Sequence, residues 1–295
     1  MTQQHTISAS SSAVPAEMPA FSLVRPENDC ALMFSSPHSG RHYPDNFLKL
    51  LRVPLMDLRR VEDAFVDQLI RGVTLSGAGQ ISANYSRSYV DLNRAPNELD
   101  SRMFRDGPPN PPGERSPRVE AGLGCIPRVA WSGHDIHRRK LRRSEADERL
   151  ELAYHPYHAA LADLLEDIAA RHGHATLIDC HSMPSVIAGR RVQADIIIGN
   201  RHGGSCDESL TRTIEDTLTR FGYRVLRNQP YAGGYLTQLH GRPMADRHAL
   251  QIEINRRLYM DENEVTLKPG FERLREDLSE LADQIVRWSK KKPRL

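Results

Sequence analysis

Two histidines stand at the ends of short apolar segments, where an imidazole is well placed to bind a metal ion. His181 closes the apolar run 175–180, and His38 follows the run 31–36 in a Pro-His-Ser-Gly turn. In open α/β sheets, ligands and catalytic groups gather at the carboxyl ends of the strands. Neutral imidazole is the commonest metal ligand, and a catalytic zinc has three protein ligands and an open position for water. We therefore predict that His38 and His181 meet at one ion.

A carboxylate is expected as the third ligand, and the nearest dense source is the pair Glu62 and Asp63. Apolar residues recur at helical spacing over 55–69, which predicts a helix. Asp63 is preferred to Glu62 because it shares a face of that helix with the acidic residue four positions later. The same pattern is typical of an ordinary solvated helix face. His134 and His137, three positions apart in a loop, form an alternative metal site.

A second carboxylate lies in a segment with strict alternation. Over 250–255, apolar residues alternate with Gln251, Glu253 and Asn255, which indicates a strand with one polar face. A carboxylate beside a metal-bound water can accept its proton and pass it to a leaving amine, so Glu253 is the candidate general base. The alternative is a half-exposed strand in which Glu253 only pairs with Arg256.

Arginines near the predicted strand ends are candidates for binding a substrate carboxylate, because a guanidinium donates two parallel hydrogen bonds to it. Arg94 or Arg256, with Asn93 nearby, would hold an α-carboxylate, and Arg190 or Arg191 would hold a second one. Arg94 is also the candidate catalytic arginine, stabilising the oxyanion. Most arginines of any protein are surface groups, and these four carry that alternative interpretation as well.

Two further features sit beside these candidates. Gly233 and Gly234 belong to a glycine turn that would let backbone N–H groups approach a ligand, although such turns are common in ordinary loops. Cys180 directly precedes His181. Neighbouring strand residues point to opposite faces, so this thiol and imidazole cannot form a nucleophile and base pair. We predict a buried core cysteine.

The elements that must position these residues alternate between strands and helices, which predicts an α/β protein. The segment 97–133 is rich in proline and glycine with little periodicity, so it is expected to be a long functional loop or lid. Residues 1–22 are predicted to be a disordered tail and residues 23–295 a single catalytic domain. Strand-like segments lie at 31–36, 80–92, 175–180, 194–199, 223–226 and 250–255, and helical patterns at 55–69, 154–171, 207–221 and 269–290.

The overall composition excludes several classes of function. The chain has 40 Lys and Arg residues and 38 Asp and Glu residues, which gives a net charge of +2. No overall electrostatic field therefore favours binding to nucleic acid or to a membrane surface. No run of about 18 apolar residues is present, which argues against a transmembrane helix. The four cysteines have no zinc-knuckle spacing, and with no secretory signal we expect reduced thiols in a cytoplasmic protein. A small-molecule substrate fits this composition, and the oligomeric state stays open.

Seven segments together resemble the N-formylglutamate amidohydrolase family. They occur in the family's order between residues 32 and 259, nearly the whole chain outside the predicted tail. They are Pro-His-Ser-Gly at 37–40 with Tyr-Pro at 43–44, Asp-Ala-Phe-Val-Asp at 63–67, Ser-Arg-Ser-Tyr-Val-Asp-Leu-Asn-Arg at 86–94, Tyr-His-Pro-Tyr-His at 154–158, Ile-Asp-Cys-His-Ser at 178–182, Asn-Gln-Pro-Tyr-Ala-Gly-Gly-Tyr-Leu-Thr at 228–237 and Gln-Ile-Glu-Ile-Asn-Arg at 251–256.

The resemblance implies a single-domain α/β fold of the phosphorylase/hydrolase type, similar to zinc peptidases, with a mixed sheet flanked by helices. It implies one zinc per chain, or another divalent metal, and hydrolysis of N-formyl-L-glutamate to formate and L-glutamate in histidine breakdown. The alternative is a deacylase or carboxypeptidase-like hydrolase of the same fold, acting on another N-acyl amino acid or peptide.

Residue by residue, the resemblance places His38 and His181 on metal histidines, Asp63 on an acid of the family and Glu253 on the position of the base. One departure concerns the third ligand. Zinc carboxypeptidases take two ligands from a His-x-x-Glu turn, whereas Arg41 stands third after His38 here. The acidic ligand must therefore come from elsewhere, and Asp63 is our inference.

Overall fold

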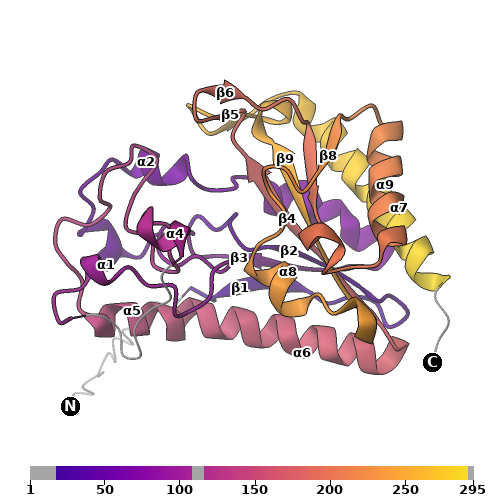
Figure 1. Ribbon diagram of the computed structural model, residues 1–295, viewed down its shortest axis with the longest axis horizontal. Coiled ribbons are helices and arrows are strands. Elements are labelled where there is room, and N and C mark those ends of the chain that lie inside the picture. The colour runs from indigo at the N-terminus through magenta and orange to yellow at the C-terminus, as the bar shows by residue number, and fades with distance from the viewer. Residues whose placement is uncertain (1–17, 108–115, 292–295) are drawn as a thin grey trace, which may run out of the picture.

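The computed structural model describes residues 18–107 and 116–291, and a seven-stranded mixed sheet forms its centre (Figure 1). The strand order is β1-β3-β2-β4-β9-β7-β8. Strands β2, β3, β4 and β9 are parallel to one another, and β1, β7 and β8 run the opposite way. Their bounds are β1 (Phe21–Val24), β2 (Leu32–Ser36), β3 (Gly79–Ala83), β4 (Ala175–Met183), β7 (Ile196–Gly199), β8 (Val225–Arg227) and β9 (Arg247–Asn255).

Helices cover both faces of this sheet. The long α6 runs beneath it in Figure 1, and α7 and α9 lie on the other side. The bounds are α1 (Asp45–Leu48), α2 (Leu55–Arg59), α3 (Val66–Leu69), α4 (Pro117–Glu120), α5 (Arg143–Arg149), α6 (His155–His172), α7 (Glu208–Arg220), α8 (Tyr235–His240) and α9 (Gly270–Lys290). Two small hairpins lie outside the sheet, β5 (Val186–Ile187) with β6 (Arg190–Arg191) and β10 (Met260–Asp261) with β11 (Thr266–Leu267).

The alternation of side chains along the central strands divides the core into two layers. Met33 and Leu177 point to the layer that contains α6, whereas Leu32, Phe34 and Ile178 belong to the layer beneath α9. Successive strand residues point to opposite faces, so each strand supplies both layers. This explains why apolar residues occupy both faces of the central strands, as expected for a sheet covered on both sides.

The row of side chains facing the α6 layer changes from apolar to polar toward the carboxyl ends of the strands. On β4 the row continues from Leu177 to Asp179 and His181, and on β9 it reaches Gln251 and Glu253. All four polar residues are buried. Buried polar groups require partners, so this change marks the place where a site can be built.

The mixed α/β architecture with flanking helices is confirmed, and the helical patterns at 154–171, 207–221 and 269–290 correspond to α6, α7 and α9. The helix predicted over 55–69 is wrong. The chain forms α2 and α3 with a turn between them, and Phe65 at the start of α3 has a left-handed φ of 65°. A β-region or left-handed residue cannot continue an α-helix.

Two other predictions differ in their boundaries. The strand predicted over 80–92 ends at Ala83, after which the chain enters turns. Residues 1–17 of the predicted tail lie outside the described residues, and Phe21 and Ser22 pair with β3 as part of β1. The described part of 97–133 is mostly irregular, as expected, with α4 and a short 3-10 turn at Ser101–Met103. Within the described residues, no helix has the length and apolar character needed to cross a membrane.

Candidate active site and metal centre

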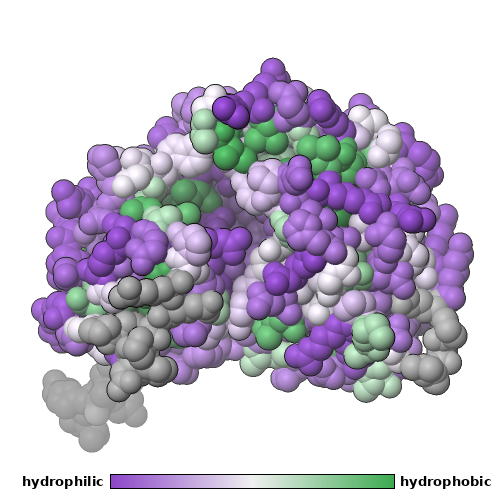
Figure 2. Space-filling model, viewed as in Figure 1, coloured by the Kyte–Doolittle hydropathy of each residue, from purple (hydrophilic) through white to green (hydrophobic). Residues whose placement is uncertain are grey.

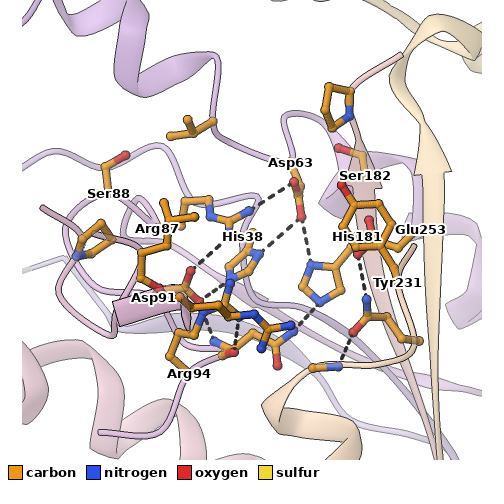
Figure 3. A pocket seen from close by; sticks show the side chains of 18 of the residues that line it. His38, Asp63, Arg87, Ser88, Asp91, Arg94, His181, Ser182, Tyr231 and Glu253 are labelled. Atoms are coloured by element: carbon orange, nitrogen blue, oxygen red, sulfur yellow. Dashed lines mark hydrogen bonds and ion pairs between the residues drawn. The ribbon is translucent and has the colours of Figure 1, made fainter. Parts of the chain in front are cut away.

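The carboxyl ends of β2, β4 and β9 bring the chemical groups together. β4 lies between the other two strands, and its register places His181 directly opposite Glu253. His38 follows β2 by two residues and is 2% exposed. The rings of His38 and His181 lie with their centroids 4.7 Å apart. The two histidines predicted from separate strand ends thus face the same point (Figure 3).

Asp63 joins the two histidines to form a cluster able to hold a metal ion. One ligand atom from each of His38, Asp63 and His181 lies within 4.8 Å of the other two. Asp63 Oδ2 is 2.9 Å from His181 Nδ1 and 3.4 Å from His38 Nδ1. The buried His38 Nδ1 has no hydrogen-bond partner. Two imidazoles, one of which has an unpartnered ring nitrogen, and one carboxylate fit a divalent metal such as zinc.

The backbone carries Asp63 to this position from the turn between α2 and α3. Its N–H donates to the carbonyl of His38 at 3.0 Å. Although burial acts to raise it, the pKa of Asp63 is held well below its usual range by the hydrogen bond from His181 and by the adjacent ring of His38. Its neighbour Glu62 turns away and accepts a short hydrogen bond from Tyr43, with a pKa raised to about 7 by burial.

Arg256 holds the other oxygen of Asp63, which corrects its predicted role. Nη2 donates to Asp63 Oδ1 at 3.0 Å, Nε to Ser182 Oγ at 3.0 Å and Nη1 to the carbonyl of Arg60 at 2.9 Å. All three nitrogens are occupied by protein acceptors, and the residue is 4% exposed. Arg256 therefore positions a candidate ligand and is neither a substrate group nor the partner of Glu253.

A second carboxylate orients each histidine ring. His38 Nε2 lies 2.6 Å from Asp91 Oδ1, and His181 Nε2 lies 2.9 Å from Asp179 Oδ2. An acidic partner on one ring nitrogen fixes the tautomer and directs the other nitrogen to the metal. Both rings consequently turn Nδ1 toward Asp63. Sequence reasoning missed these roles, although Asp179 stands two residues before His181, on the same strand face.

Asn93 and Gly234 belong to the frame of the site. Asn93 Nδ2 lies 3.0 Å from His181 Nε2 and 3.3 Å from Asp179, and Asn93 Oδ1 accepts from the backbone of Leu236 at 2.8 Å. The backbone N–H of Gly234 donates to Gln251 at 2.7 Å. A Cβ on Gly234 would stand 2.3 Å from Asn93 Nδ2, so the glycine permits this close approach. Neither residue has the free polar group that its predicted substrate role required.

Glu253 lines the pocket beside His181, and it is 7% exposed. Gln251 donates to its Oε1 at 2.7 Å. Burial raises the pKa of Glu253 to about 7, with the charge of His181 acting to lower it and that of Asp63 to raise it. A carboxylate with a pKa near neutrality can both accept and return a proton.

Besides Arg256, the pocket is lined by Arg87, Arg118 and Arg94, and Arg94 bonds to backbone carbonyls. It donates only to the carbonyls of Asn93 at 2.7 Å and Leu123 at 3.2 Å. Among the described residues no carboxylate lies within 4.0 Å of Arg94 or Arg118, whereas Arg87 pairs with Asp91 at 2.9 Å. Burial lowers the pKa of Arg94, and the charges of Arg87 and Arg118 lower it further against the opposing effect of Asp91. A cluster of three cationic side chains favours the binding of an anion.

Arg190 and Arg191 do not reach this pocket. After Met183 the chain leaves the sheet, and both arginines lie exposed on the β5–β6 hairpin, outside the pocket lining.

The alternative pair of histidines, His134 and His137, does not form a metal site. His134 is exposed, while His137 is buried next to Arg149 at 3.2 Å, and burial with that charge lowers the pKa of His137 to about 3.

The pocket above the cluster has a volume of about 370 Å³. Figure 2 shows it as a hollow between the strands and the part of the molecule that contains α1, α2 and α4. Besides the groups already described, Gly233 and Tyr231 line it on the β9 side. Sequence reasoning did not find the apolar residues of its opposite wall, which come from the irregular segment after α4, namely Leu123, Pro127, Val129 and Trp131.

Comparison with known proteins places this arrangement in a family. A family model for N-formylglutamate amidohydrolase matches residues 30–260. The chain is 27% identical to an N-formylglutamate deformylase of Pseudomonas aeruginosa, over 88% of this chain and 94% of that protein. It is 28% identical to one from Pseudomonas putida, over 79% and 83% of the two chains.

A solved structure agrees with these relatives. The crystal structure of N-formylglutamate amidohydrolase from Ralstonia eutropha superposes with a TM-score of 0.86 at 34% identity, covering 92% of this chain and 98% of that one. A protein from Agrobacterium tumefaciens, Atu2144, shares the fold with a TM-score of 0.65 at 19% identity. The resemblance inferred from seven short segments is confirmed. The protein is an amidohydrolase, and its chain belongs to the N-formylglutamate amidohydrolase family.

Proposed function

We propose that this enzyme hydrolyses the formyl amide of N-formyl-L-glutamate to formate and L-glutamate, with one zinc ion held by His38, Asp63 and His181. One observation carries the proposal. Three buried ligand atoms lie within 4.8 Å of one another, in a pocket that also contains Glu253 and two arginines with no carboxylate within 4.0 Å among the described residues, Arg94 and Arg118. The names of the relatives from two Pseudomonas species support the choice of substrate.

The bound zinc would supply a Lewis acid for the formyl carbonyl and lower the pKa of a bound water. The remaining chemistry belongs to the side chains. Glu253, with a pKa near 7, accepts a proton from the attacking water and delivers it to the departing nitrogen. Asp91 and Asp179 keep the two imidazoles turned toward Asp63 throughout.

Arg94 holds the α-carboxylate of the substrate, because its guanidinium has no carboxylate partner within 4.0 Å among the described residues. Arg118 holds the side-chain carboxylate in place of Arg190 and Arg191, which lie outside the pocket. Both arginines are on the same wall, so the two carboxylates of one glutamate meet neighbouring cations. This wall also stabilises the negative charge that develops on the formyl oxygen.

We place the reaction in the cytoplasm. All four cysteines, Cys30, Cys125, Cys180 and Cys206, are unpaired and buried, which is consistent with a reducing compartment. Burial raises the pKa of Cys180 well above its usual range, so its thiol is no nucleophile.

Formate release from N-formyl-L-glutamate, measured together with bound metal, tests the proposal. We expect about one zinc per chain, loss of activity after chelation and recovery on adding zinc. Asp63→Asn should lose both zinc and activity, whereas Glu253→Gln should lose activity and keep the zinc. Asp67→Asn and Glu264→Gln are the matched controls, since neither residue belongs to the ligand cluster or lines this pocket. Full activity of the chelated enzyme would contradict the metal assignment.

A further inference from the structure

An apolar surface on the pocket wall has no counterpart in N-formylglutamate. Leu123, Val129 and Trp131, which we call the shelf, all line the pocket. Leu123 is 45% exposed and Trp131 47% exposed, so about half of each large apolar side chain faces solvent. In Figure 2 hydrophobic side chains gather on the left-hand edge of the hollow, which is the side of α4 in Figure 1. Exposed apolar surface at a pocket mouth is typical of a binding site.

The shelf is held in place by ion pairs and backbone hydrogen bonds of Arg128. Arg128 Nε lies 2.7 Å from Asp100, and Arg128 Nη1 lies 2.6 Å from Asp135. The backbone of Arg128 donates to Gly122 and accepts from Ile136, both at 2.8 Å. The tryptophan is therefore presented by a fixed framework, and a preformed apolar contact loses little conformational entropy on binding.

The shelf adjoins the arginine assigned to the α-carboxylate. Arg94 Nε donates to the carbonyl of Leu123 at 3.2 Å, and Arg118 lines the same wall. A substrate whose α-carboxylate binds Arg94 would therefore direct its side chain along this wall. The wall offers that side chain two alternatives, which are the guanidinium of Arg118 and the apolar faces of Leu123 and Trp131.

We propose that the enzyme also hydrolyses N-formyl derivatives of amino acids with large apolar side chains, which bind against the shelf. This inference rests on the deformylase function proposed above. The reaction is the same: the water oxygen bonds to the formyl carbon, the carbon–nitrogen bond breaks, and one water proton passes to the nitrogen, giving formate and the free amino acid. The pocket volume of about 370 Å³ is within the range that holds drug-sized ligands, which are larger than N-formylglutamate.

The test compares kcat/KM for N-formyl-L-phenylalanine and N-formyl-L-glutamate in four forms of the intact, zinc-loaded enzyme. We expect the wild type to release formate from both. Trp131→Ala should lower the phenylalanine to glutamate ratio about tenfold or more, because an aromatic contact is lost. Arg118→Ala should raise the same ratio. Trp288→Phe is the control, since this residue lies on α9 outside the pocket lining.

Fluorescence gives a second readout that does not depend on turnover. The chain has two tryptophans, so in Trp288→Phe the emission comes from Trp131 alone. N-formyl-L-phenylalanine added to the Trp288→Phe, Glu253→Gln double variant should change that emission in a saturable way.

The outcomes separate the two proposals. Formate from N-formyl-L-glutamate without formate or an emission change from the phenylalanine compound would overturn the shelf inference and leave the proposed function standing. Formate from the phenylalanine compound alone would support the shelf and refute N-formylglutamate as the substrate. No formate from either compound, with zinc bound, would overturn both.

Discussion

The carboxylates behind the two histidines provide the sharpest quantitative test of the proposed metal centre. Asp91 accepts from His38 Nε2 at 2.6 Å with one oxygen, and Arg87 donates to the other at 2.9 Å. Asp91→Asn keeps an acceptor of nearly the same shape but removes the charge, whereas Asp91→Ala removes both. A comparison of the two variants therefore separates the effect of charge from that of orientation.

The expected loss of zinc affinity follows from the geometry. Hydrogen bonds to charged groups contribute about 1.5–3 kcal/mol, and Asp91 is 3% exposed, so little solvent screening applies. Outer carboxylates of this kind usually change metal affinity by about 10- to 100-fold, or about 1.4–2.7 kcal/mol. We expect Asp91→Asn near the lower limit, because the amide oxygen still accepts from Nε2. Asp91→Ala should lie near the upper limit, because His38 is then free to rotate.

Competition with a chromophoric chelator at fixed pH measures the zinc dissociation constant of each variant. Asp100→Asn is the matched control, because Asp100 is equally buried and paired with two arginines but touches no candidate ligand. Asp179→Asn should weaken zinc binding in the same way through His181. If both Asp91 variants bound zinc within twofold of the wild type, the ring orientation would not depend on this carboxylate and the reasoning would be refuted.

Other predictions concern the frame and the core. Gly234→Ala should reduce formate release at least tenfold, since the new Cβ would displace the side chain of Asn93, and an unchanged rate would contradict this close contact. Leu278→Ala, beneath the opposite face of the sheet, should cost about 2–5 kcal/mol in denaturant unfolding while kcat is retained. Burial lowers the pKa of His158 and His240 to about 4 in the folded protein, whereas a histidine of the unfolded chain has a pKa of about 6.5. As the pH falls below about 6.5, the unfolded chain therefore binds protons before the folded protein does. Stability should then fall between pH 6.5 and 4 by up to about 1.4 kcal/mol per pH unit for each histidine, and His240→Gln should remove one such contribution. If the stability of His240→Gln fell with pH as steeply as that of the wild type, His240 would not contribute to this pH dependence.

The parts of the site that depend on local pattern were accessible from the sequence. His38 and His181 follow short apolar runs, and the position of a strand end is a local property of such a run. Alternation along β9 likewise put Glu253 on a polar row. The arginines were harder to assign. Arg190 and Arg191 look the same in sequence as Arg94, and only the departure of the chain into a hairpin sets them apart.

Asp63 shows most clearly why the remaining part depends on tertiary structure. It was chosen over Glu62 for its place on a helix face, yet that helix does not exist at this position. Two adjacent acids in a turn have nearly the same local sequence, so their environments must distinguish them. Asp63 contacts the rings of His181 and His38 and accepts from Arg256, whereas Glu62 accepts a hydroxyl hydrogen bond from Tyr43 and lies 3.9 Å from Arg59. Burial acts to raise the pKa of both acids, but the contacts of Asp63 with His181 and His38 and the charge of Arg87 hold its pKa low, whereas the pKa of Glu62 stays raised. Because a metal ligand must be deprotonated, the partners that the fold brings to Asp63, one of them 118 residues away in sequence, determine which acid can serve.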